Sequence, residues 1–305
     1  MKRHFRFLAA LIGLLCFWPD AGMAQIRVVA STTDLAEFVS VVGGDKVTVD
    51  VLVRGTQNPH YIELKPSFMM QVRRADVFFL IGMRFELWSQ QIIDGSRNAD
   101  LTVVDCSDGI QKLEVPTGRV DARHGDVHPY GNPHYWLDPS NVPVILNTIV
   151  RSLSRLSPRD AAAFESNARS YTVVLLAKLS GWKRRMKPFE GKEIVTYHTT
   201  FSYFVHRFGI AVAGYIEPKP GIPPTPVHIS DLMNLMRKHG ITVIGLEQYF
   251  EESVPNAVAS AVDGTVIRLV SSVGGSEDAT SYIALIEHNI RKLEIAFAAN
   301  GMQPR

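Results

Sequence analysis

Cysteine is almost missing from this chain, which contains only two. One of them, Cys16, lies in an N-terminal segment that we expect to be removed, so the mature chain keeps Cys106 alone. A single thiol cannot form an internal disulfide, which excludes a disulfide-stabilised fold even in an oxidising compartment. We therefore expect the stability of the protein to come from its hydrophobic core.

An excess of charge of one sign is also missing, because 32 Lys and Arg residues nearly balance 30 Asp and Glu residues. Loss of residues 1–24 removes three basic side chains and one acidic one, so the formal net charge falls from +2 to zero. Nucleic acid or another acidic polymer is therefore not expected as a partner. Beyond the N-terminus, no apolar run reaches the roughly 20 residues that a membrane-spanning helix needs.

The first 24 residues have the pattern of a secretory signal peptide. A basic start at residues 2–6 precedes an apolar segment at residues 7–18, and small residues within 21–24 favour cleavage before Gln25. Cys16 follows Gly-Leu-Leu rather than the small pair that usually precedes a lipid-modified cysteine, which disfavours a lipid anchor. We expect a soluble, exported, periplasmic protein.

From residue 25 onward, short β-branched segments alternate with amphipathic ones, a pattern typical of parallel sheets covered by helices. The expected strands are residues 26–30, 47–53, 76–81, 101–104, 193–197, 210–213, 241–246 and 265–270. The expected helices are residues 35–42, 67–75, 85–93, 201–207, 227–238, 254–261 and 281–299. The sequence therefore predicts an α/β protein of two lobes, each with a mainly parallel four-stranded sheet.

The middle of the chain predicts a loop and two further helices. Residues 106–132 are rich in Gly, Asp, Pro and His without a clear period, and we interpret them as a surface loop. Asp138 and Pro139 then predict a helix N-cap followed by proline at the first helical position, in a helix that ends near Leu156.

One long helix is expected to join the two lobes. Ser157 and Pro158 repeat the start signal, and apolar side chains continue at helical spacing as far as Trp182. At ~1.5 Å per residue this helix extends about 40 Å. The predicted divisions of the chain are the signal peptide (1–24), an N-terminal lobe (25–156), the linking helix (157–188) and a C-terminal lobe (189–305).

Three of the ten histidines stand out by their position. The tetrapeptide Asn-Pro-His-Tyr occurs twice and presents His60 and His134 in proline-stiffened turns, while His198 directly follows an expected strand. Ligands of open α/β sheets bind at the carboxyl ends of the strands, so we expect these three imidazoles to meet in a cleft between the lobes. Tyr61, Tyr135, Trp136 and Tyr203 are expected to form the wall of this cleft.

Imidazole ligands favour zinc, copper or nickel, whereas manganese prefers sites richer in carboxylate oxygen. Zinc needs a fourth ligand or a water molecule, and no carboxylate is singled out by spacing alone. The candidates are Glu217, Glu247, Glu277 and Asp278, although a loop surface charge or a helix cap is the simpler interpretation of each. His124 and His128 flank the irregular loop, and either transient metal capture or no role is compatible with their positions.

Several segments resemble the zinc and manganese solute-binding proteins of bacterial ABC transporters, the cluster A-I family. The resemblance covers nearly the whole mature chain and is carried by residues 58–61, 65–67, 131–139, 197–203, 217–226 and 271–274. It implies two α/β lobes joined by a rigid long helix, with a metal ion held between the lobes and delivered to a membrane permease.

The resemblance also implies that His60, His134 and His198 are the metal ligands. The family commonly has an Asp that aligns with Ser271, so the fourth position falls to water, to Glu247 or Asp278, or to another group. The absence of an anionic oxygen among three imidazoles counts against manganese. The prediction is therefore a monomeric, extracytoplasmic zinc-binding receptor of an ABC importer and not an enzyme.

Two other functions remain open at this point. Three histidines and a water molecule also form the zinc site of some hydrolases, although the chain has no His-Glu-x-x-His motif to supply a general base. A surface adhesin is a role sometimes proposed for proteins of the family that the chain resembles.

Overall fold

The structure is a computed structural model, which describes residues 25–117, 128–219 and 221–299. The predicted signal peptide and His124 lie outside the described residues. Within the described part of the chain, no helix is both long and apolar enough to cross a bilayer.

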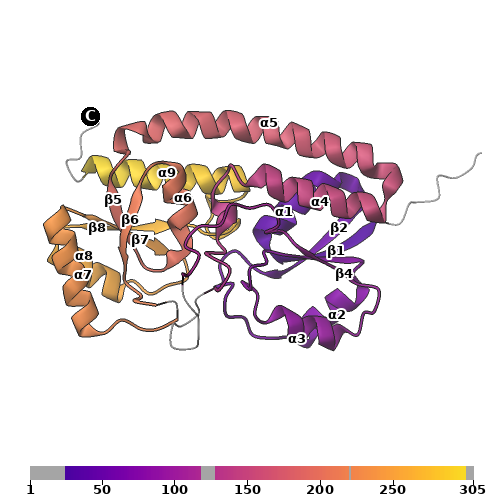
Figure 1. The fold of residues 1–305 in the computed structure, drawn as a ribbon, viewed down its shortest axis with the longest axis horizontal. Helices are drawn as coiled ribbons and strands as arrows, with labels where there is room; N and C mark the ends of the chain where they lie inside the picture. The colour runs from indigo at the N-terminus through magenta and orange to yellow at the C-terminus, as the bar shows by residue number, and fades with distance from the viewer. Residues whose placement is uncertain (1–24, 118–127, 220, 300–305) are drawn as a thin grey trace, which may run out of the picture.

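The first sheet has four parallel strands in the order β2-β1-β3-β4. They are β1 (Ile26–Thr32), β2 (Val47–Val53), β3 (Val77–Leu80) and β4 (Thr102–Asp105), with helices α1 (Thr33–Gly43), α2 (Pro66–Arg74) and α3 (Ser89–Ser96). Alternate residues of β1 serve opposite faces, because Val28 packs in the cluster of α1 and Val29 in the cluster of α2 and α3. Figure 1 shows α1 on one side of this sheet and α2 and α3 on the other.

The second sheet repeats this arrangement with the parallel order β6-β5-β7-β8. Its elements are β5 (Glu193–Thr196), β6 (Ala211–Tyr215), β7 (Val243–Glu247), β8 (Thr265–Leu269), α6 (Ser202–Arg207), α7 (Pro226–His239), α8 (Ser253–Ala261) and α9 (Tyr282–Ala299). Val195 packs with α7 and α8, whereas its neighbour Ile194 faces the cluster that contains α9. The predicted two-sheet α/β fold is therefore confirmed.

Helix α5 (Ala161–Met186) runs along both sheets, beside α4 (Val142–Leu156) at one end and α9 at the other (Figure 1). Near its end, the Trp182 indole N–H donates to Glu287 at 2.7 Å, and Arg185 pairs with Glu287 and Glu294 at 2.6 Å each. These contacts fasten the long helix to α9. The division of the chain at residues 156 and 188 remains a prediction.

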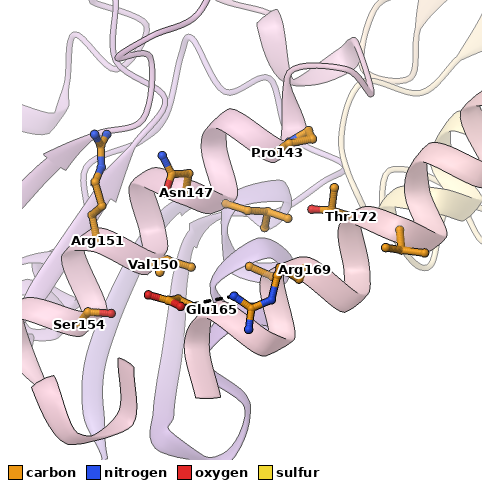
Figure 2. A pocket seen from close by; sticks show the side chains of 11 residues that line it. Pro143, Asn147, Val150, Arg151, Ser154, Glu165, Arg169 and Thr172 are labelled. Carbon is orange, nitrogen blue, oxygen red and sulfur yellow. Dashed lines mark hydrogen bonds and ion pairs between the residues drawn. The ribbon is translucent and has the colours of Figure 1, made fainter. Parts of the chain in front are cut away.

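A surface pocket of about 610 Å³ lies between α4 and α5 (Figure 2). Leu146, Ala168 and Val173 contribute to its lining, and Glu165 pairs with Arg169 at 3.3 Å along its edge. None of the histidines predicted to bind metal lines this pocket. It is therefore separate from the strand ends where those histidines lie.

The two lobes share one hydrophobic core. Phe38 of α1 and Tyr282 of α9 meet edge to face with ring centroids 4.9 Å apart. The Trp136 indole N–H donates to the Ser271 carbonyl at 2.9 Å, and the Tyr282 hydroxyl donates to the Trp136 carbonyl at 2.5 Å. Because these contacts are buried, they hold the strand ends of the two sheets in a defined relation.

The predicted start of α4 is wrong by three residues. The helix begins at Val142 with Asn141 as its N-cap, and no side chain makes the capping hydrogen bond. Asp138 instead accepts hydrogen bonds from the Ser140 N–H and hydroxyl, each at 2.8 Å, and forms a two-pronged ion pair with Arg207 of α6 at 2.7 Å. Asp138, which the sequence predicts to be a helix cap, thus joins the first lobe to α6 of the second lobe.

Candidate metal centre

His60 lies in a turn after β2 that rests against the second lobe. Asn58 Oδ1 accepts a hydrogen bond from the His60 backbone N–H at 3.0 Å, which fixes the turn. Gly55, earlier in the same loop, packs on the backbone of residues 273–275, where an added Cβ would lie 2.1 Å from the Val273 carbonyl oxygen. Only glycine permits this approach, and it seats the His60 loop on the opposite lobe.

His134 is held by a similar turn with one further contact. Asn132 Oδ1 accepts hydrogen bonds from the His134 backbone N–H at 2.9 Å and from the ring Nδ1 at 2.8 Å. The Asn132 amide N–H groups donate to Glu114 and to the Thr199 carbonyl, at 2.8 Å each. These partners determine the orientation of the amide and place the proton of His134 on Nδ1, so Nε2 carries a lone pair.

His198 follows β5 and projects from the carboxyl edge of the second sheet. Its Nδ1 donates to Glu217 Oε2 at 2.8 Å, and both side chains are buried. Within the described part of the chain, its buried Nε2 has no hydrogen-bond partner. The carboxylate therefore orients the ring and leaves the Nε2 lone pair available to a ligand.

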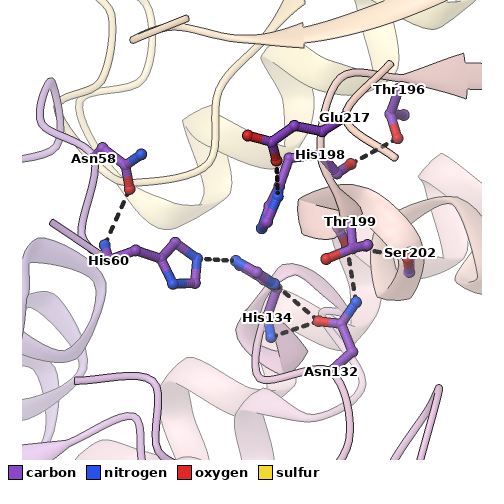
Figure 3. Close-up of polar contacts among 9 residues, drawn as sticks. All are labelled: Asn58, His60, Asn132, His134, Thr196, His198, Thr199, Ser202 and Glu217. Atoms are coloured by element: carbon purple, nitrogen blue, oxygen red, sulfur yellow. Dashed lines mark hydrogen bonds and ion pairs between the residues drawn. The ribbon is translucent and has the colours of Figure 1, made fainter. Parts of the chain in front are cut away.

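The structure brings the three predicted histidines together (Figure 3). One nitrogen of each lies within 4.8 Å of the others, and the Nε2 atoms of His60 and His134 are 3.0 Å apart. The exposed fractions of His60, His134 and His198 are only 8%, 1% and 5%. Three imidazole nitrogens thus face one small, buried volume, an arrangement that suits a metal ion with nitrogen ligands.

Burial keeps His134 uncharged at neutral pH. It lowers the pKa of His134 well below the ordinary value of 6.5, and the neighbouring His60, His198 and His128 lower it further. A neutral imidazole is the form that binds metal. His134 is therefore ready for a metal ion at neutral pH.

The aromatic surroundings differ in part from those predicted. The Trp136 ring lies 5.4 Å from the His134 ring, as expected of a cleft wall, whereas Tyr61 is 61% exposed at the rim. The Tyr135 hydroxyl donates to the Ile81 carbonyl, and the Tyr203 hydroxyl accepts from the Leu113 N–H and donates to the Gln111 carbonyl, so both hydroxyl groups are bonded to the backbone.

Sequence reasoning missed Phe85, whose ring contacts His60 at 4.6 Å and His134 at 5.5 Å between centroids. No local signal marks this residue, because the contact depends on tertiary structure. The roles of Asn58 and Asn132 were also missed, although the asparagine two residues before each histidine is the sequence signal of such a turn.

The candidate carboxylates fall in different places. Glu217 contacts His198 through the ring Nδ1, on the side away from the shared centre, and Glu247 is fully buried at the end of β7. Asp278 is 63% exposed and pairs with Arg291 at 3.0 Å, and Glu277 is also exposed. Ser271 accepts the Trp136 indole N–H at its carbonyl, and its hydroxyl lies 3.1 Å from the Gln248 amide. Asp278 is thus poorly placed for a ligand.

His128 lies beside the three histidines, with its ring centroid 5.4 Å from that of His60, and it is 8% exposed. It does not belong to the group whose nitrogens lie within 4.8 Å of one another in the described structure. A role for His128 in metal capture remains a prediction.

The sequence matches a family model described as "Zinc-uptake complex component A periplasmic" over residues 28–296. The chain belongs to this family. Its members are extracytoplasmic solute-binding proteins and not enzymes, so the predicted resemblance is confirmed and the chain is a metal-binding solute-binding protein.

Relatives of the chain are named for different metals. The high-affinity zinc uptake system protein ZnuA of Brucella abortus (strain 2308) is 28% identical over 303 residues, which cover 87% of this chain and 88% of that protein. The manganese-binding lipoprotein MntA of Halalkalibacterium halodurans is 27% identical, with 95% and 96% covered. The solved structure of FpvC from Pseudomonas aeruginosa in complex with Mn²⁺ has a TM-score of 0.78, 23% identity and coverage of 91% and 100%.

Proposed function

We propose that this protein captures zinc between its lobes and delivers it to the membrane permease of an ABC importer. The observation that carries the proposal is the meeting of His60, His134 and His198 in one buried volume. Two of these rings have Nδ1 committed to Asn132 and Glu217, which directs Nε2 toward the shared centre. Such preorganisation reduces the cost of ordering the ligands when the ion binds.

The set of ligand atoms supports zinc over manganese. In the described structure, no carboxylate oxygen joins the three imidazole nitrogens in the group within 4.8 Å. Manganese favours oxygen ligands, whereas zinc accepts three imidazoles and a water molecule in tetrahedral geometry. Because relatives are named for either metal, the choice of zinc depends on these ligands and not on the names. Copper and nickel also accept imidazole ligands, so their affinities for the protein are the ones to compare with that of zinc.

The placement of the ligands supports a transport role. His60 and His134 come from segments packed with the first sheet and His198 from the edge of the second, so a bound ion joins the lobes. Separation of the lobes by a permease would break this bridge and release the ion. We further propose that residues 1–24 export the chain to the periplasm and that it acts as a monomer.

A hydrolytic role has no support in this geometry. The three imidazoles are at most 8% exposed, which leaves a substrate no access to an ion among them. The family also consists of solute-binding proteins. No feature of the described residues favours a surface adhesin.

Zinc titration of the His198→Ala protein tests the proposal, with His239→Ala as the matched control. His239 is an exposed histidine on α7, paired with Glu193 at 3.2 Å and remote from the centre. Loss of one of three protein ligands is expected to weaken zinc binding by at least about 100-fold, whereas the control keeps the parent affinity. Competition against a chromophoric chelator measures both constants. Parent-like binding by the His198→Ala protein would show that the site is misassigned.

A further inference from the structure

Glu247 lies level with His198 at the carboxyl edge of the second sheet. Thr196 of β5 pairs in parallel register with Gly245 of β7, and His198 and Glu247 each lie two residues beyond this pair, close enough for His198 to lower the pKa of the Glu247 carboxyl. Glu217 holds the corresponding position on the other side of His198, after β6. The histidine is therefore flanked by two glutamates.

These two glutamates have different surroundings. Glu217 accepts the His198 Nδ1 proton at 2.8 Å, whereas neither carboxylate oxygen of Glu247 has a hydrogen-bond partner of normal geometry among the described residues. Glu247 is 0% exposed. Burial raises the pKa of its carboxyl, and the nearby His198 and Thr200 lower it. A buried carboxylate without a hydrogen bond of normal geometry is costly, so we infer that it serves a ligand that is present only part of the time.

The charge of a metal ion would supply this missing partner. Three neutral imidazoles leave both positive charges of a divalent ion uncompensated in a buried volume. Glu217 offsets one of them through the His198 ring. Ser271 offers no charge, and its hydroxyl and N–H contact Gln248 at 3.1 Å each. At this edge of the described sheet, Glu247 is the second buried carboxylate beside His198.

We propose that Glu247 accepts a hydrogen bond from the water molecule that fills the fourth position on the metal. The inference rests on the proposed metal-binding function. A water-mediated contact fits the geometry, because the three imidazole nitrogens cluster within 4.8 Å without a Glu247 oxygen among them. Glu247 then balances the second charge of the ion without adding a direct oxygen ligand. The site keeps the nitrogen-rich character that favours zinc over manganese.

The test compares Glu247→Gln with the parent and with Glu86→Gln at pH 7.5. Glu86 is a suitable control because it is also buried, at 5% exposed, and its oxygens already accept hydrogen bonds within the first lobe. We expect Glu247→Gln to weaken Zn²⁺ binding by about 10- to 100-fold, as for other residues that support a metal from the outside. The Glu86→Gln protein is expected to keep the parent affinity within about twofold, because the Glu86 carboxylate bonds to Ser31, Ile81 and Gly82 and not to a histidine.

Cobalt substitution distinguishes a water-mediated contact from direct ligation. The visible absorption of Co²⁺ in the Glu247→Gln protein should keep the parent's four-coordinate intensity, because the water ligand remains. A change of coordination number would overturn the proposal by showing that Glu247 binds the metal itself, and an unchanged zinc affinity would overturn it as well.

Circular dichroism first confirms that each variant is folded. If Glu247→Gln does not fold, Glu247→Asp keeps the charge but moves it back by one methylene group, and we expect zinc binding to weaken by about tenfold. Parent-like zinc binding by that variant contradicts the proposal. Failure of the parent itself to bind Zn²⁺ would instead refute the proposed function.

Discussion

The two sheets have the same strand order, yet the buried glutamates at their corresponding edges have opposite surroundings. In the first lobe, Glu86 follows β3 and accepts hydrogen bonds from the Ser31 hydroxyl at 2.6 Å and from the Ile81 and Gly82 N–H groups at 2.7 and 3.1 Å. In the second lobe, Glu247 ends the corresponding strand β7 and has no such partner among the described residues.

This difference separates a structural carboxylate from one that is available to a ligand. Ser31 on β1 satisfies Glu86, whereas the corresponding strand β5 leads into His198 beside Glu247. The same α/β topology therefore supports a closed polar cluster in one lobe and one wall of the proposed metal centre in the other. Function lies in the side chains placed at the sheet edge and not in the topology itself.

The largest expected effect concerns the pH dependence of the metal-free protein. Burial raises the pKa of Glu86 from 4.5 to about 7. The folded state thus holds a proton that the unfolded chain releases near pH 4.5, and the contribution of Glu86 to stability declines as the pH rises from 4.5 to 7. The loss amounts to about 3 kcal/mol at most. Urea unfolding with chelator present should show a weaker pH dependence over this range in Glu86→Gln than in the parent; equal slopes would contradict the assignment.

The next effect tests the role of charge beside His198. Glu217→Gln preserves a hydrogen-bond acceptor for Nδ1 but removes the negative charge, so we expect zinc binding to weaken by about 10- to 100-fold. In the first lobe the corresponding partner of a histidine is the neutral Asn132, and Asn132→Ala should cost only about tenfold through loss of ring orientation. Chelator competition gives both ratios. A larger loss of zinc affinity for Asn132→Ala than for Glu217→Gln would contradict the proposal that the charge of Glu217 contributes more than the neutral amide of Asn132.

Much of this architecture is predictable from the sequence, because β-branched segments and helical spacing are local signals. All eight predicted strands are present, and β2 has the predicted bounds, Val47–Val53. The repeated tetrapeptide and the strand-end position of His198 were sufficient to select three histidines that the structure brings together.

Contacts between distant segments explain what the sequence did not predict. Asp138 before proline has the local pattern of a helix cap, but Arg207, far along the chain, binds this carboxylate instead. The pairing of Glu217 with His198 depends on the order of β6, β5 and β7, which periodicity does not reveal. Phe85 reaches His60 only in the folded protein.

The X-ray absorption spectrum of the protein loaded with one equivalent of Zn²⁺ tests the central claim most directly. The account predicts four nearest atoms, three imidazole nitrogens at about 2.0 Å and one oxygen at about 2.0–2.2 Å. Fewer than three imidazoles, or a shell of five or six mainly oxygen ligands, would contradict a zinc centre built from His60, His134 and His198.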